Sequence, residues 1–328
     1  MSIPTTHPFD FDPTYGKQLA DLLAVKQPEA PEGFDDFWEA RYLRALTVDP
    51  QPVLRRSKIS HPDWHVLDLV YISTGSFRIG GWLILPRQGE VRRGLVVGHG
   101  YGGRDRPEFD LPVKETAVLF PCCRGLSLSA RPPISQNPSW HVLHDIDKPK
   151  SYIIGGCVED IWLAVSTLAA LYPWLSGHIG YSGISFGGGI GAMAIAYDPR
   201  IDRGHLALPS FGHQPLRLEL PSVGSAQGVQ EYQAEHENVL ETLRFFDAAT
   251  QFLLLACLEQ RPLSDVAEIH PHEIELLVRH AGGHGSIAVV SIGIFTFRVG
   301  DRLIVEGFGI LFAKKPVGRL GTVFGGLV

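Results

Sequence analysis

Hydrophobic and polar positions alternate along this chain with two different periods. Residues 64–72 and 77–85 alternate apolar and polar side chains, and Thr74-Gly75-Ser76 lies between them. A period of two interrupted by a short turn is typical of a β-hairpin. Residues 34–43 and 160–172 instead carry apolar side chains at helical spacing, so each is predicted to form a helix that packs against a core.

Three short apolar runs predict buried strands. They are residues 94–97, 116–120 and 178–181, and runs of this length bounded by turn residues suit a parallel sheet. Residues 186–197 are rich in small apolar side chains and predict a helix that ends at Asp198-Pro199. Strand, loop and helix therefore alternate, which predicts an α/β fold with a mostly parallel central sheet flanked by helices.

The most informative motif follows the third of these strands. Gly183-Ile184-Ser185-Phe186-Gly187 reads Gly-x-Ser-x-Gly, the pattern of a nucleophile elbow, in which a sharp strand-to-helix turn lifts a serine Oγ above the sheet. The backbone at the serine is strained, and glycines on either side avoid collisions with neighbouring backbone. Taken alone, the motif also fits a glycine-rich turn with an incidental serine.

A second motif favours the elbow. Residues 98–103, Gly-His-Gly-Tyr-Gly-Gly, follow the strand at 94–97. In α/β-hydrolases one oxyanion-hole N–H comes from this loop and the other from the residue after the serine, here Tyr101 and Phe186. The same glycines spell a dinucleotide fingerprint, but no acidic residue ends the strand at 116–120 and a charged Pro-containing segment replaces the required helix.

Composition limits the classes of partner. The chain has 328 residues, 45% of them hydrophobic, and a net charge of −6. This length predicts a single domain over residues 1–328. Within it we expect an N-terminal extension at 1–60, a cap or loop segment at 205–245, and a tail at 286–328. The absence of a basic run argues against nucleic acid and anionic membranes. Four cysteines form no disulfide framework, and nothing at residues 1–10 marks secretion, so we expect a cytoplasmic protein.

In combination these motifs resemble the acetyl xylan esterase / cephalosporin C deacetylase family, carbohydrate esterase family 7 of the α/β-hydrolase superfamily. The resemblance covers roughly residues 10–250, with two departures: Leu126 and Phe186 stand where the family usually has Gln. It implies a serine esterase that deacetylates acetylated sugars or small acetyl esters, needs no metal or organic cofactor, and forms a homo-oligomer. The matching segments are Phe34-Asp35-Asp36-Phe37-Trp38, Ile79-Gly80-Gly81-Trp82-Leu83, His99-Gly100-Tyr101-Gly102-Gly103, Cys123-Arg124-Gly125, Gly183-Ile184-Ser185-Phe186-Gly187-Gly188 and Phe245-Phe246-Asp247.

A serine nucleophile needs a histidine base and an acid that orients it, in the chain order Ser, acid, His. His284 follows a strand-like run at 275–279 and lies in a glycine-rich loop, so it is the first candidate base, with His280 as its competitor. The histidines at 270, 272, 280 and 284 do not match the spacing of a zinc site, and no metal is expected.

The acid remains open between two residues. Glu259 ends the apolar run at 252–258, and Asp265 lies six residues farther on. Glu259 is preferred because the strand end should deliver it to the sheet edge, although both also fit solvated loop carboxylates. Asp247 is interpreted as a helix residue of the Phe-Phe-Asp segment. Arg124 is interpreted as an anchor at the core edge with several backbone acceptors, and Asp160 as its candidate partner.

Beyond residue 250 the resemblance fades. The tail at 286–328 is β-rich and differs from the helical end of the family. The sequence therefore leaves a second hypothesis open: a non-catalytic α/β-hydrolase-like binding protein with an incomplete triad.

Overall fold

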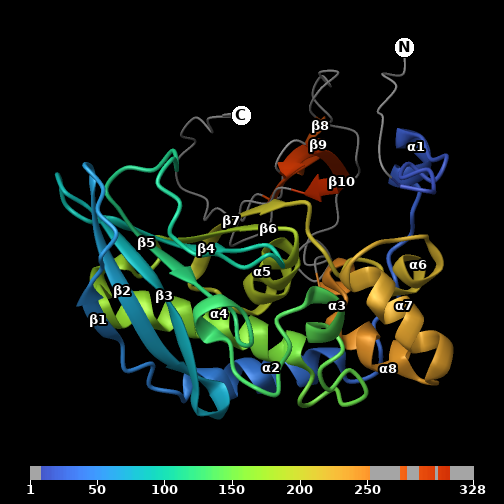
Figure 1. Ribbon diagram of the computed structural model, residues 1–328, viewed down its shortest axis with the longest axis horizontal. Coiled ribbons are helices and arrows are strands. Elements are labelled where there is room, and N and C mark those ends of the chain that lie inside the picture. The colour runs from blue at the N-terminus through green and yellow to red at the C-terminus, as the bar shows by residue number, and fades with distance from the viewer. Residues whose placement is uncertain (1–8, 252–273, 279–287, 300–301, 311–328) are drawn as a thin grey trace.

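The computed structural model describes residues 9–251, 274–278, 288–299 and 302–310 (Figure 1). Its centre is a seven-stranded sheet with strand order β1-β2-β3-β5-β4-β6-β7. Strands β2, β4, β5, β6 and β7 run in one direction, whereas β1 and β3 run against them. The strands are β1 (Val53–Arg56), β2 (Trp64–Ser73), β3 (Phe77–Pro86), β4 (Arg93–Gly98), β5 (Thr116–Pro121), β6 (Ile179–Ile184) and β7 (Ile201–Ala207). The mostly parallel sheet predicted from the sequence is confirmed.

The predicted hairpin is β2 and β3. The two strands pair antiparallel along their full length, from Trp64 opposite Pro86 to Ser73 opposite Phe77. A single 3-10 turn, Thr74–Ser76, joins them, and Gly75 adopts φ 65° there. This backbone conformation favours glycine, so the turn residue and the alternating pattern together determine the register.

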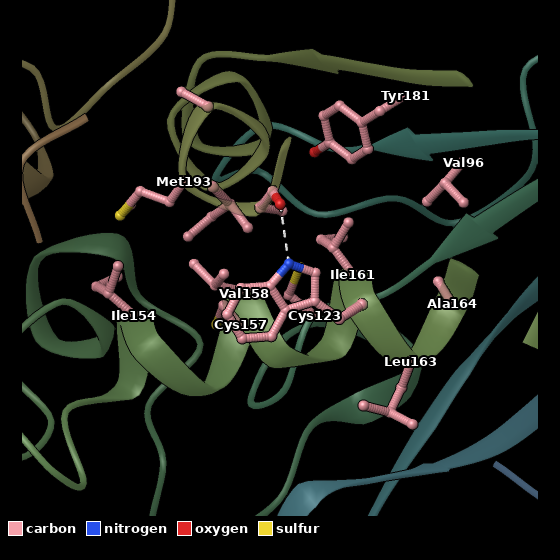
Figure 2. Packing of buried hydrophobic residues seen from close by; sticks show 14 of the residues in the cluster. Val96, Cys123, Ile154, Cys157, Val158, Ile161, Leu163, Ala164, Tyr181 and Met193 are labelled. Carbon is pink, nitrogen blue, oxygen red and sulfur yellow. Dashed lines mark hydrogen bonds between the residues drawn. The ribbon is translucent and has the colours of Figure 1, made fainter. Parts of the chain in front are cut away.

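Three helices build the main core against the sheet. Helices α2 (Phe34–Leu46), α4 (Ile153–Leu171) and α5 (Phe186–Tyr197) contribute to one cluster of buried residues. Figure 2 shows Val158 and Ile161 of α4 in one cluster with Met193 of α5 and with Val96 and Tyr181 from the strands. A smaller cluster, which includes Trp82 and Phe120, is formed by alternate residues of the same strands. Their side chains lie on the other face of the sheet.

Helix α4 begins at Ile153, seven residues before the predicted start at 160. Two adjacent glycines, Gly155 and Gly156, disfavour a helix by their low helix propensity. At either position, however, a Cβ would lie within 2.6 Å of an arginine side chain, from Arg41 or Arg124, so only glycine lets these side chains pack on the helix. Tertiary packing against these arginines therefore outweighs the low helix propensity of glycine. By length and composition α4 could cross a bilayer, but 83% of its apolar window is buried inside the fold.

The segment after β7, predicted as a cap or loop segment at 205–245, contains three helices. It forms α6 (Gln214–Glu219), α7 (Ser225–Glu235) and α8 (Val239–Leu243). Pro215 lies in the first turn of α6, where proline is well tolerated and favours a helix start. The remaining described helices are α1 (Leu19–Leu23) and α3 (Pro138–His141).

The described part of the C-terminal region is a three-stranded antiparallel sheet with strand order β10-β9-β8. Its strands are β8 (Ile274–Val278), β9 (Ala288–Val299) and β10 (Arg302–Ile310). The strand predicted at 275–279 lies one residue earlier, and the β-rich character expected of the tail is present in β9 and β10.

Candidate active site

Ser185 occupies a strained turn between β6 and α5. Its backbone adopts φ 51° and ψ −114°, which non-glycine residues rarely do. Three backbone hydrogen bonds hold the turn. The Ser185 N–H donates to the Ala207 carbonyl (2.8 Å), and the Ser185 carbonyl accepts from Ser210 (3.0 Å) and Gly189 (2.9 Å). The end of β7 and the start of α5 thus stabilise a conformation that the local chain alone would avoid.

The two glycines of the motif are required by close backbone approach. A Cβ on Gly183 would lie 2.5 Å from the Gly187 carbonyl oxygen, and one on Gly187 would lie 2.7 Å from the His99 carbonyl oxygen. The second contact also shows that the loop after β4 packs directly on the start of α5. The predicted reason for the glycines is therefore confirmed in the geometry.

The loop after β4 lies beside Ser185. A Cβ placed on Gly100 would lie 4.0 Å from the Ser185 Cβ, and the Tyr101 ring lies 4.3 Å, centroid to centroid, from the Phe186 ring. Among the described residues, neither the Tyr101 N–H nor the Phe186 N–H donates to an acceptor. The structure thus brings the predicted serine and both predicted N–H donors together. No helix follows this loop directly, which removes the dinucleotide interpretation.

His99 belongs to this loop but has a structural role. It is 3% exposed, and its Nε2 accepts the Cys123 N–H at 3.0 Å. Nδ1 therefore carries the proton and donates to the Gly100 carbonyl at 2.7 Å. With both ring nitrogens occupied, His99 holds the loop against the end of β5.

A second buried histidine, His141 of α3, was not predicted from the sequence. Its Nε2 donates to the Arg124 carbonyl at 2.9 Å, so its Nδ1 accepts the Tyr101 hydroxyl at 3.2 Å. Burial lowers the pKa of His141 to about 4. Asn137 caps α3 by accepting the Ser139 N–H, so a helix start could have been found in the sequence. Nothing in the pattern shows which α3 side chain turns inward.

Arg124 is paired with Asp160, as predicted. Its Nη2 lies 2.6 Å from Asp160 Oδ1, and its backbone N–H donates to Asp160 Oδ2 at 2.9 Å. Burial alone would lower the pKa of Arg124, but Asp160 more than offsets this and the net pKa is raised. The prediction of backbone acceptors is wrong. Among the described residues the guanidinium donates to Asp160 and to the hydroxyls of Ser73 and Thr74, because the end of the hairpin lies against it.

Asp247 binds backbone N–H groups. Its carboxylate accepts N–H groups from His213 (2.9 Å), Gln214 (2.5 Å) and Ala249 (2.9 Å). It is 1% exposed, and burial raises its pKa despite these donors. The interpretation of Asp247 as a helix residue is wrong, because its backbone is extended (φ −102°, ψ 109°) directly after the 3-10 turn at 244–246. Its carboxylate instead accepts N–H groups at the starts of two helical segments, which is the role of a cap.

The remaining predicted site residues lie outside the described residues. These are the candidate bases His284 and His280 and the candidate acids Glu259 and Asp265. Their roles stay predictions.

Comparisons with known proteins identify the family and the fold of this chain. Residues 19–252 match the sequence model of the acetyl xylan esterase family, AXE1. The chain belongs to the acetyl xylan esterase family. The match ends almost where the sequence resemblance fades, and this family membership makes the protein a serine hydrolase that acts on carboxylic ester bonds.

Two solved structures share the fold. The acetyl xylan esterase from Paenibacillus sp. R4 has a TM-score of 0.62 and 20% identity, covering 72% of this chain and 80% of that one. Acetyl xylan esterase 1 from Thermoanaerobacterium sp. JW/SL YS485 has a TM-score of 0.61 and 19% identity, covering 72% and 79%. Among curated proteins, no sequence matches the chain significantly. The α/β-hydrolase fold is thereby confirmed.

Proposed function

We propose that this acetyl xylan esterase family member hydrolyses acetyl esters, including those of acetylated sugars, with Ser185 as its nucleophile. The observation that carries the proposal is the strained backbone of Ser185 beside two N–H groups, of Tyr101 and Phe186, that lack acceptors among the described residues. Such an arrangement suits acyl transfer, because the carbonyl oxygen gains negative charge just where preorganised donors can stabilise it.

In the proposed reaction Ser185 Oγ attacks the ester carbonyl carbon and His284 takes the hydroxyl proton. The carbonyl electrons move to the oxygen, which the two N–H groups hold. The bond to the sugar oxygen then breaks, and His284 returns the proton to the leaving alcohol. Water, deprotonated by His284, attacks the acetyl-enzyme and releases acetate and free Ser185.

The proposed acid keeps the imidazole in the tautomer that can accept the serine proton and stabilises the imidazolium that forms. Glu259 is the preferred candidate and Asp265 the alternative. The substrate class rests on the family match, because the site geometry supports acyl transfer but does not bear on the identity of the acyl group. The enzyme requires no metal or organic cofactor in this scheme, and its expected partner is a small-molecule ester.

A fluorophosphonate probe tests the proposal, because it forms a covalent bond only with an activated serine. We expect mass spectrometry to find one adduct, on Ser185, in the wild-type protein and in a Ser182→Ala control. Ser182 lies on β6 and contacts His205, so its loss should leave the elbow intact. Failure of folded wild-type protein to react would favour the alternative of a non-catalytic binding protein with an incomplete triad.

A further inference from the structure

The side chain of Tyr101 is held at two points. Its ring packs on Phe186 with a centroid distance of 4.3 Å and an interplanar angle of 35°. Its hydroxyl donates to His141 Nδ1 at 3.2 Å. The backbone N–H of the same residue is one of the two proposed oxyanion donors, so whatever fixes the side chain also restricts the orientation of that N–H.

His141 contacts both residues that supply these donors. Its ring meets Tyr101 edge-on at 5.4 Å and Phe186 edge-on at 6.1 Å. The imidazole is fully buried. Three mutually packed rings therefore connect the loop after β4 with the start of α5, and the one polar contact among them is the bond from the Tyr101 hydroxyl.

The position of His141 is fixed independently of Tyr101. Its Nε2 donates to the Arg124 carbonyl, and Arg124 is itself anchored to Asp160 on α4 by its backbone and guanidinium. On the other side α3 packs tightly on α7, since a Cβ on Gly228 would lie 2.8 Å from the Ser139 carbonyl oxygen. A chain of contacts thus runs from the core helix α4 to the oxyanion loop.

We propose that His141 is a positioning residue that holds Tyr101, and through it the oxyanion N–H, in the geometry needed for catalysis. This inference rests on the proposed function of the Ser185 site. His141 does not act as a base, because both of its ring nitrogens are already bonded. Burial favours its neutral form, and a neutral imidazole with the proton on Nε2 leaves Nδ1 free to accept the hydroxyl.

Two substitutions separate this role from simple packing. Tyr101→Phe keeps the ring and removes the hydroxyl. His141→Gln keeps a donor that can reach the Arg124 carbonyl but loses the acceptor at the Nδ1 position. Removing an oxyanion donor outright costs about 10²–10³ in kcat, so misplacing one should cost roughly tenfold. We expect each variant to lose about tenfold in kcat on an acetyl ester with KM changed less than about twofold.

The double variant supplies a stricter criterion. If the hydroxyl and the imidazole act through one hydrogen bond, Tyr101→Phe combined with His141→Gln should be no worse than either single variant. His141→Asn should retain more activity than His141→Gln, because its amide oxygen lies near the original Nδ1 and can still accept the Tyr101 hydroxyl. His144→Gln, three residues away, is a matched control and should retain wild-type kcat.

The kcat values are to be expressed per active site titrated with a fluorophosphonate, which removes any effect of misfolded protein. Single variants within twofold of wild type per titrated site, or losses that multiply in the double variant, would overturn the positioning role. If His141→Gln fails to fold, Tyr101→Phe and His141→Asn decide the matter alone. A wild-type protein that neither reacts with the probe nor hydrolyses acetyl esters would instead refute the proposed function, and this inference with it.

Discussion

At the residue scale, the local rules of steric fit were sufficient to predict the elbow. The Gly-x-Ser-x-Gly spacing predicted a strained serine flanked by glycines, and Gly183 and Gly187 both lie where a Cβ would collide with backbone. His141 could not be predicted in the same way. Its contact with Tyr101 joins residues 40 positions apart and depends on how α3 packs, which no local pattern encodes.

The glycine argument gives a direct prediction. Gly187→Ala should separate the loop after β4 from α5, since the new Cβ would lie 2.7 Å from the His99 carbonyl oxygen. Overpacking of this kind typically costs 1–3 kcal/mol. We expect about that loss in the free energy of unfolding, measured with urea, together with lower esterase activity. Gly212→Ala is the control, because its nearest neighbour, Ala249, would be an ordinary 4.0 Å away. Equal stability of the two variants would contradict the close-approach account.

At the scale of elements, periodicity identified the hairpin to within one residue. The run of small apolar residues that ends at Asp198-Pro199 identified helix α5 with its observed bounds. Periodicity misplaced the start of α4 and did not identify the helices within the cap or loop segment at 205–245. In both places residues that usually interrupt helices, glycine in one and proline in the other, are accommodated by position or packing. The arginines that pack on Gly155 and Gly156 come from distant parts of the chain, so the sequence pattern misplaced the start of α4. Pro215 is accommodated locally, because it lies in the first turn of α6.

The buried ion pair between Arg124, in the turn after β5, and Asp160 of α4 predicts a stability effect at this scale. Asp160→Asn removes the charge opposite Arg124, whose side chain is only 13% exposed. Leaving one partner of a buried pair uncompensated costs about 3–5 kcal/mol. Chemical denaturation should show a loss of this size. Lys148→Ala, which breaks an exposed pair with Asp145, should change stability by less than about 1 kcal/mol. Similar small effects from both would show that Arg124 finds other partners.

At the scale of the whole molecule, chain order of motifs was more informative than any motif alone. The loop after β4, the Arg124-Gly125 turn and the elbow occur in the order that the sequence resemblance expects, and the family match covers residues 19–252. The structure joins these separate segments at one end of the parallel strands. The rest of the triad was assigned from residues beyond 251, where only strands β8, β9 and β10 are described, so those assignments remain to be tested.

The pH dependence of activity tests the assignment of the base. His284 must be neutral to accept the serine proton, so kcat/KM should fall as pH drops below the ordinary histidine pKa of about 6.5. His284→Ala should be nearly as damaging as loss of the nucleophile, whereas His280→Ala should be mild. The opposite ranking would assign the base to His280.

The acid is tested by substitutions that keep size and remove charge. Glu259→Gln and Asp265→Asn should differ strongly, because only the carboxylate bonded to the catalytic imidazole controls its tautomer, at a cost of about 10⁴ in kcat. We expect the larger loss for Glu259→Gln. Wild-type rates in both variants would exclude both residues as the triad acid.

Ser185 is proposed as the nucleophile of an acetylesterase, and replacing it with alanine provides the decisive test. The rate of acetate release from an acetylated xylo-oligosaccharide or 4-nitrophenyl acetate is compared between the wild type and Ser185→Ala, with circular dichroism to confirm that both are folded. Loss of a triad nucleophile typically costs about 10⁶ in kcat, so hydrolysis by the variant should fall to background. A folded Ser185→Ala protein with activity within tenfold of wild type would contradict it.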